Sequence, residues 1–172
     1  MCGIAGFITA GSHSSGVEME QFLAAMSDAI IHRGPDDGGS WSNADAGVWL
    51  GHRRLAIVDL SPAGRQPMQS ASGRYMIAFN GEIYNHLLLR QALESAEQVP
   101  NWHGHSDTET LLMGFDVWGI QGTVERAIGM FAFAVWDSQK STLTLGRDRL
   151  GEKPLYYGWQ GQGSAAVFLF GS

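Results

Sequence analysis

Cysteine, long apolar segments and excess positive charge are all scarce in this sequence. Its 172 residues include a single cysteine, so no disulfide can form within the chain, which is typical of a reducing compartment such as the cytoplasm. There is no run of 18 apolar residues and no N-terminal signal peptide, so nothing predicts membrane insertion or export. The net charge of −6 argues against a nucleic acid or an anionic membrane as the partner.

Motifs for metal and phosphate binding are lacking as well. His103 and His105 form the only close histidine pair, and neither a nearby cysteine nor a His-Glu-x-x-His spacing accompanies them. The chain has no Gly-x-x-x-x-Gly-Lys-[Ser/Thr] loop and no clear Gly-x-Gly-x-x-Gly after a strand. We therefore expect no metal and no cofactor in this chain. Its length predicts a single domain, residues 1–172, that buries roughly 70% of its unfolded surface.

The single cysteine is the second residue of the chain. Removal of Met1 would place a thiol and a free α-amine on Cys2. An α-amine has a pKa of roughly 7.7–8.0, so near neutral pH it is a base that can accept the thiol proton directly or through a water. This pairing of nucleophile and base is that of N-terminal hydrolases. A small buried cysteine with a purely structural role is the alternative.

Hydrophobic spacing predicts a chain of mixed helices and strands. Helices are expected from a capping box at Ser15 and Glu18 to Gly34, over about 85–96, and from a second capping box at Ser106 and Glu109. Strands are expected at 4–8, 47–52, 55–59, 75–79, 130–137, 142–147, 155–159 and 166–170, the last four as a meander. The polar stretch 32–39 is predicted to lie outside the core, and 146–154 to form a solvated loop.

Asn80 and Gly81 directly follow the strand predicted over 75–79. A side-chain amide and a backbone N–H are the two kinds of donor that stabilise an oxyanion during attack on an amide. A hairpin turn is the simpler interpretation of Asn-Gly. The residues that follow, however, lead into a predicted helix rather than back along a strand.

Two charged positions have the chemistry to hold the head group of an amino acid. Arg53 and Arg54 lie between two predicted strands, and an arginine matches a carboxylate in a bidentate geometry. Asp107 lies in the first turn of a capped helix, where its carboxylate could bind an ammonium group. Surface arginines and a favourable interaction with the helix dipole are the simpler interpretations.

Together these motifs resemble the class II glutamine amidotransferase domain, above all that of glutamine-hydrolysing asparagine synthetases. The matching blocks run through the whole chain: Met1-Cys2-Gly3-Ile4, His32-Arg33-Gly34-Pro35-Asp36, His52-Arg53-Arg54-Leu55-Ala56-Ile57-Val58-Asp59, Phe79-Asn80-Gly81-Glu82-Ile83-Tyr84-Asn85, Ser106-Asp107-Thr108-Glu109, Gly129-Met130-Phe131-Ala132-Phe133, and Gly146-Arg147-Asp148 through Pro154-Leu155-Tyr156-Tyr157. The resemblance implies an α+β fold of the N-terminal-nucleophile hydrolase class, an αββα sandwich of two stacked antiparallel sheets flanked by helices.

The resemblance also implies a reaction and a role for each matching residue. Cys2 matches a nucleophile that attacks the side-chain amide of glutamine, forming a γ-glutamyl thioester that releases ammonia and then glutamate. Asn80 and Gly81 match the oxyanion hole. Arg54 matches the arginine that binds the α-carboxylate of glutamine, and Asp107 the carboxylate that binds its α-ammonium. The rest of the glutamine pocket is implied to be Leu55, Ala56, Ile57, Val58 and Glu82.

The synthetases of this family carry a second domain that binds ATP through a Ser-Gly-Gly-x-Asp loop, and these 172 residues contain no such loop. We expect glutamine as the substrate and, as partner, a C-terminal synthetase domain or acceptor subunit that uses ATP and Mg²⁺, with a homodimer as one assembly. The segment 147–154 matches a region of domain contact. Asparagine synthesis from aspartate is the expected outcome. The alternatives are amidation of another carboxylate, such as a sugar acid in polysaccharide biosynthesis, hydrolysis of another amide, and a catalytically idle binding domain.

Overall fold

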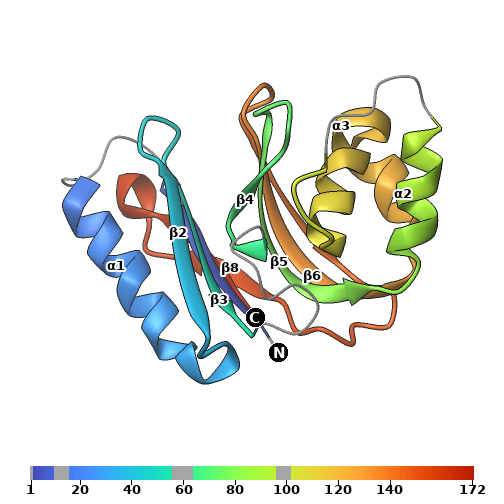
Figure 1. Ribbon diagram of the computed structural model, residues 1–172. Coiled ribbons are helices and arrows are strands. Elements are labelled where there is room, and N and C mark those ends of the chain that lie inside the picture. Colours follow the sequence, from blue (N-terminus) through green and yellow to red (C-terminus); the bar gives the residue numbers. More distant parts are fainter. Residues whose placement is uncertain (1, 10–15, 56–63, 96–101) are drawn as a thin grey trace.

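The computed structural model describes residues 2–9, 16–55, 64–95 and 102–172. Within these ranges the strands form one sheet of five strands and one of four, both antiparallel. The two sheets pack face to face, and helices cover the outer face of each (Figure 1). The order of layers is therefore helix, sheet, sheet, helix, which confirms the predicted α+β sandwich.

The five-stranded sheet has the order β2-β3-β1-β9-β8, with the N-terminal strand at its centre. Its strands are β1 (Gly3–Thr9), β2 (Asp37–Asn43), β3 (Val48–Arg54), β8 (Tyr156–Gln160) and β9 (Val167–Gly171). The helix α1 (Gly16–Ala29) lies on the outer face, where Leu23 packs against Phe7 and Trp49. The short helix η1 (Ile31–Arg33) then leads into β2. The strand β1 is paired on both sides, which fixes its backbone. Cys2 directly precedes β1, so its position is fixed as well.

The four-stranded sheet has the order β4-β5-β6-β7. Its strands are β4 (Met68–Gln69), β5 (Tyr75–Ile83), β6 (Gly129–Asp137) and β7 (Thr142–Arg147). Its outer face is covered by α2 (His86–Glu94) and by α3 (Asp107–Arg126), which kinks at Gly119. The apolar cluster between them includes Phe79, Leu111, Phe115 and Phe133.

The inner faces of the two sheets meet in a second apolar layer. Large side chains such as Leu50, Trp136 and Phe170 fill its centre. Toward the start of β1 the layer thins to Ile4 with two small residues, Ala78 and Ala132. The sheets approach one another most easily where the side chains are small, and this thin part of the layer adjoins the ends of β1 and β5 that carry the predicted site.

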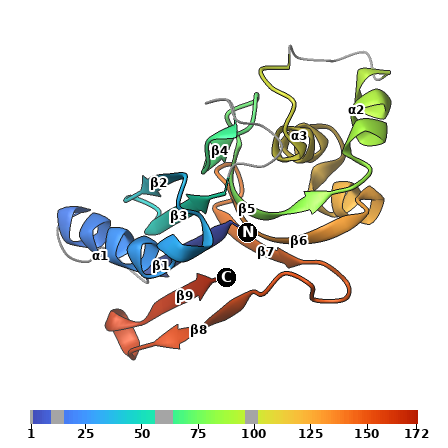
Figure 2. The ribbon, with the colours of Figure 1, turned by 60° about the horizontal axis from the view of Figure 1, so that its bottom comes forward.

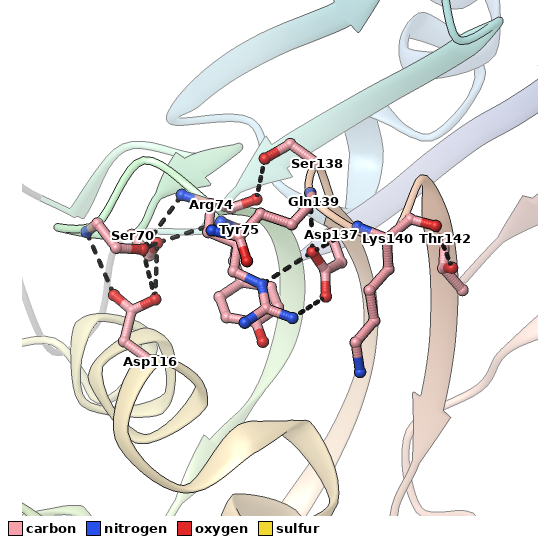
Figure 3. A network of polar contacts seen from close by, with 10 residues as sticks. Ser70, Arg74, Tyr75, Asp116, Asp137, Ser138, Gln139, Lys140 and Thr142 are labelled. Carbon is pink, nitrogen blue, oxygen red and sulfur yellow. Dashed lines mark hydrogen bonds and ion pairs between the residues drawn. The ribbon is translucent and has the colours of Figure 1, made fainter.

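A polar network ties the far end of the four-stranded sheet together (Figure 3). The Arg74 guanidinium donates to both carboxylate oxygens of Asp137, at 2.9 and 2.6 Å. The carboxylate of Asp116, on α3, accepts hydrogen bonds from the hydroxyls of Ser70 and Ser72, at 3.2 and 2.6 Å. These bonds anchor the turn between β4 and β5 both to β6 and to the covering helix.

Several expected boundaries differ from the structure. The strand predicted to end at residue 79 continues through Asn80 and Gly81 to Ile83, so Asn-Gly is not a turn. The meander is divided, because β6 and β7 belong to one sheet and β8 and β9 to the other (Figure 2). The polar stretch predicted over 32–39 ends in an unpredicted edge strand, β2, which alternates between half-buried and exposed residues. Ser15 and most of the strand predicted over 55–59 lie outside the described residues.

Candidate active site

A cavity of about 150 Å³ lies where the ends of β1, β3 and β5 meet the start of α3. Every described residue that the sequence predicted for the site lines it: Cys2, Arg54, Leu55, Asn80, Gly81, Glu82 and Asp107. The remaining three predicted residues, Ala56, Ile57 and Val58, lie outside the described residues, as does Met1. Positions more than 100 residues apart in the sequence therefore come together in a single pocket.

The Cys2 thiol is held by the backbone of Leu55. The Leu55 N–H donates to the sulfur at 3.4 Å, and the sulfur lies 3.7 Å from the Leu55 carbonyl oxygen. Cys2 is half-buried, with one side on the cavity. The nucleophile candidate is thus fixed between two strands of a sheet but remains open to a bound molecule.

Arg53 and Arg54 point to opposite sides, as alternating residues of a strand do. Arg53 donates to the Ser27 carbonyl oxygen at 3.2 Å and pairs with Asp28, so it is fastened to α1. Arg54 lines the cavity and is buried. Gly34 packs on the backbone that joins the two arginines, where a Cβ would lie 2.4 Å from the Arg53 carbonyl oxygen. The structure thus distinguishes a structural arginine from one that faces the pocket.

One edge of β5 has no partner strand beside the cavity, because β4 is only two residues long. Backbone groups that face this edge need other partners. The Phe79 N–H donates to Gln66 Oε1 at 2.7 Å, and the Phe79 carbonyl accepts from His52 Nε2 at 3.0 Å. The Ile83 N–H donates to Asp107 Oδ2 at 2.9 Å. Side chains from β3, from α3 and from the segment before β4 thus replace the missing strand.

Gly81 lies between Phe79 and Ile83 and turns its N–H toward the same edge, since every second residue of a strand shares a side. Phe131, opposite Gly81 in β6, directs its own N–H and carbonyl to Asp148, at 3.2 and 2.8 Å. Among the described residues, none accepts a hydrogen bond from the Gly81 N–H. Within the described part of the chain, this backbone donor is therefore available at the cavity.

The close approach of β6 explains why residue 81 is glycine. A Cβ there would lie 2.4 Å from the Met130 carbonyl oxygen and 2.7 Å from Phe131 Cα. Asn80, the other predicted oxyanion donor, is 1% exposed, and its side-chain amide donates to Ser172 Oγ at 3.4 Å. Ser172 is itself fixed, because its N–H donates to the Ile4 carbonyl at 2.9 Å. Both predicted donors thus have defined positions.

Asp107 opens α3, and the predicted cap is present one residue earlier. The Glu109 N–H donates to Ser106 Oγ at 3.2 Å. The reciprocal half of the capping box is missing, because the Glu109 carboxylate instead accepts from the N–H groups of His103 and Gly104, at 2.7 and 3.1 Å. Burial raises the pKa of Asp107, although its hydrogen bond from the Ile83 N–H opposes that shift. A cation bound beside Asp107 would favour its charged form.

The segment predicted to be a solvated loop is instead folded around Asp148. Its carboxylate accepts from the N–H groups of Leu150, Glu152 and Lys153 at 2.9–3.1 Å, as well as from Phe131. Burial raises the pKa of this carboxyl, but these four donors outweigh burial, and the pKa is lowered. Lys153 is 5% exposed and lines the cavity. The prediction was therefore wrong for Asp148 and Lys153, whereas Leu150 does project into solvent.

The sequence did not predict Gln66 and Lys153, which line the cavity, or His52, which lies beside it at the Phe79 carbonyl. Gln66 precedes a proline in a polar stretch, and His52 sits among strand residues, so neither carried a sequence signal of its own. Among the described residues, no group of three or more histidine, cysteine or acidic side chains could hold a metal ion. Within the same part of the chain, no helix is long and apolar enough to cross a membrane.

Comparison with known proteins agrees with this geometry. Residues 1–172 match the family described as the glutamine amidotransferase domain. The chain is 40% identical over 174 residues to asparagine synthetase [glutamine-hydrolyzing] 3 of Bacillus subtilis, covering all of this chain and 26% of that protein. It is 37% identical to amidase chry2 of Gibberella zeae, covering 91% of this chain and 24% of that protein. The chain thus spans about a quarter of the length of these relatives.

A solved structure has the same fold. The glutamine phosphoribosylpyrophosphate amidotransferase of Bacillus subtilis superposes with a TM-score of 0.72 over 99% of this chain and 41% of that one, at 19% sequence identity. At that identity the likeness concerns the fold alone. The match over the full length of the chain and the identity to its relatives show that the chain belongs to the enzyme family of glutamine amidotransferase domains.

Proposed function

We propose that this domain hydrolyses glutamine to glutamate and ammonia through a thioester on Cys2. The observation that carries the proposal is the shared cavity, which is lined by Cys2, by Gly81, whose N–H has no acceptor among the described residues, and by the charged residues Arg54 and Asp107. A nucleophile, an oxyanion donor and two opposite charges are the groups that hydrolysis of an amino-acid amide needs.

The reaction begins once Met1 has been removed. The α-amine of Cys2 takes the thiol proton, and the sulfur attacks the side-chain amide carbon of glutamine. The Gly81 N–H and the Asn80 amide stabilise the resulting oxyanion. The protonated amine gives its proton to the leaving nitrogen, and ammonia departs as the C–N bond breaks. A water, deprotonated by the same amine, then attacks the thioester and releases glutamate and the free thiol.

The head group of glutamine sets the specificity. The Arg54 guanidinium binds the α-carboxylate, and the Asp107 carboxylate binds the α-ammonium. Leu55 and Glu82 form a further part of the pocket wall. An acylase acting on other amides would need neither charge, so the presence of both in the cavity supports an amino-acid substrate.

The ammonia is consumed elsewhere in the full protein. We infer a C-terminal synthetase domain that uses ATP and Mg²⁺ to make asparagine from aspartate in the cytoplasm, because the relative with 40% identity carries that name and is about four times longer. Amidation of another carboxylate, such as a sugar acid, is the second candidate for the full protein, whereas the identity to a protein named an amidase bears on the other alternative, hydrolysis of another amide. Lys153 lines the cavity and belongs to the segment folded around Asp148, and we propose this segment as the contact with that second domain. Glutamine is the small-molecule partner, a homodimer is the proposed assembly, and neither nucleic acid nor membrane is a proposed partner.

The test combines one substitution with one mass measurement. Cys2→Ala should abolish release of ammonia from glutamine, with asparagine hydrolysed by neither protein, while the melting temperature stays within a few degrees. Mass spectrometry of the wild-type protein should show that Met1 is absent. Wild-type turnover in the Cys2→Ala variant, or a mature protein that keeps Met1, would refute the mechanism and favour an idle binding domain.

A further inference from the structure

His52 is a buried polar side chain between the two sheets. It belongs to β3, is 1% exposed, and reaches across to the edge of β5, where Nε2 lies 3.0 Å from the Phe79 carbonyl oxygen. A carbonyl only accepts hydrogen bonds, so the proton of the neutral ring is on Nε2. Nδ1 is then a buried acceptor, and no described residue donates to it. A histidine kept in the core with one nitrogen unsatisfied needs an explanation beyond packing.

We propose that His52 is a positioning residue for the oxyanion site: together with Gln66 it fixes the Phe79 backbone, so that the Gly81 N–H faces the carbonyl under attack. The inference rests on the proposed function and extends it to residues that do not touch the substrate's reacting atoms. His52 donates to the Phe79 carbonyl and Gln66 accepts from the Phe79 N–H, both at the open edge of β5.

His52 and Gln66, the two side chains that bond Phe79, are each held by a different element. His52 is held by its place in the paired strand β3, opposite Ile4. The Gln66 amide donates to Thr108 Oγ1 at 3.3 Å, at the start of α3. The edge of β5 is therefore hydrogen-bonded, through His52, to the sheet that carries Cys2. Through Gln66 it is connected to the helix that carries Asp107. The Ile83 N–H bond to Asp107 fixes the same edge farther along β5, and β6 pairs with the opposite edge, so His52 and Gln66 set the position of the edge at Phe79.

Phe79 and Gly81 are only two residues apart in β5, so a movement of one displaces the other. Two residues of a strand span about 6.7 Å, so a tilt of about 10° at Phe79 moves the Gly81 N–H by about 1 Å. A displacement of about 1 Å in a catalytic group lowers the rate by up to about 10²-fold. The effect should appear in kcat, because the Gly81 N–H acts on the oxyanion of the transition state.

A direct proton-transfer role does not fit His52. Burial lowers its pKa to about 4, even though the bond to the Phe79 carbonyl favours the protonated ring. The nearby charges of Arg54 and Asp37 act in opposite directions on that pKa. His52 does not line the cavity, and its one proton is engaged. A neutral donor that does not titrate should therefore be able to replace it.

The test uses two variants of His52 and one control. His52→Phe keeps the ring but removes the donor, whereas His52→Gln places an amide N–H near the position of Nε2. Thr123→Val serves as the control, because it removes another buried donor, bonded to the Gly119 carbonyl at 2.8 Å within α3 and away from the cavity. Glutamine hydrolysis is measured from pH 5.5 to 9, and the rate of Cys2 alkylation by iodoacetamide is measured alongside.

His52→Phe should lower kcat for glutamine by about 10- to 100-fold with KM within about 3-fold of wild type. His52→Gln should restore kcat to within about 5-fold, with an unchanged pH profile. Alkylation of Cys2 needs no oxyanion hole and should proceed at the wild-type rate in all variants, and Thr123→Val should keep the wild-type kcat. If His52→Phe does not fold, Gln66→Leu carries the same expectation, because it removes the acceptor for the Phe79 N–H.

The inference is overturned if His52→Phe keeps kcat within 2-fold of an active wild type, or if the loss falls on KM instead. Equal loss in His52→Phe and His52→Gln, or a lost limb of the pH profile in both, would also overturn it. A wild-type protein that does not hydrolyse glutamine would reject the proposed function itself, and this inference with it.

Discussion

The substitution Gly81→Ala tests whether the oxyanion site depends on the spacing of two strands. An added Cβ would lie 2.4 Å from the Met130 carbonyl oxygen and 2.7 Å from Phe131 Cα. Both are backbone atoms of β6, so no side-chain rotation can relieve the contact. Ordinary van der Waals contact begins near 3.4 Å, and β5 must therefore move away from β6 by about 1 Å at this point.

The displacement affects stability and rate differently. Forcing a methyl group into a packed interior costs about 1–3 kcal/mol of unfolding free energy. Moving the Gly81 N–H by about 1 Å should lower kcat by about 10²-fold, and KM should change little because the head group is held elsewhere. The lowered kcat reflects lost stabilisation of the oxyanion and not a lost nucleophile, so Cys2 should still react with iodoacetamide.

Gly158→Ala is the matched control, because an added Cβ at Gly158 meets nothing within 4 Å. It lies on β8, at the far edge of the other sheet, and should change stability by less than about 0.5 kcal/mol with no effect on kcat. Steady-state ammonia release and urea denaturation measure the two quantities. A Gly81→Ala protein that is less stable but retains wild-type kcat would refute the role of this N–H, and one unchanged in both would refute the strand geometry.

Two further predictions concern titrating groups. Asp107→Asn should raise KM for glutamine by about 10- to 100-fold, because a charged hydrogen bond to the α-ammonium is worth about 1.5–3 kcal/mol. Burial already disfavours the charge of Asp107, so the melting temperature of the variant should change little. An unchanged KM with a lowered melting temperature would make Asp107 only a helix-terminal residue. The second compares wild type with His52→Gln in urea at pH 7 and near pH 4. The His52 pKa falls from 6.5 to about 4 on folding, so the unfolded chain binds the proton first and stability is lost as the pH drops through this window. The difference between the two proteins should change by about 3 kcal/mol, and a constant difference would contradict a buried neutral ring.

The residues that line the candidate site could be predicted from the sequence because each lies in a local motif that the family resemblance marks. Cys2 is the second residue, Asn80 and Gly81 follow an apolar strand, and Asp107 follows a helix cap. The strands of β1 and β6 were predicted nearly to their ends because their apolar runs are long. The motifs thus locate residues that meet in one cavity and most of the elements that hold them.

The remaining features depend on tertiary contacts that no local pattern encodes. The strand β2 is polar because it is an edge strand, and its pairing with β3 decides its conformation. Asn-Gly has the composition of a turn, yet at this position glycine serves the close approach of β6. The segment around Asp148 has the composition of a solvated loop. Its fold becomes evident only from the four N–H groups that donate to the Asp148 carboxylate. In each case a polar residue is explained by a partner distant in sequence.

The position of the active site follows from where β4 ends. An unpaired strand edge is usually a liability, since its free N–H and C=O groups attract other chains. Here the edge beyond β4 is satisfied one group at a time, by Gln66 and His52 at Phe79 and by Asp107 at Ile83. Between them, the Gly81 N–H has no acceptor among the described residues, at the point where Cys2 faces the same cavity. A longer β4 would pair this donor within the sheet and remove it from the reaction, so the short strand is itself a requirement of the proposed catalysis.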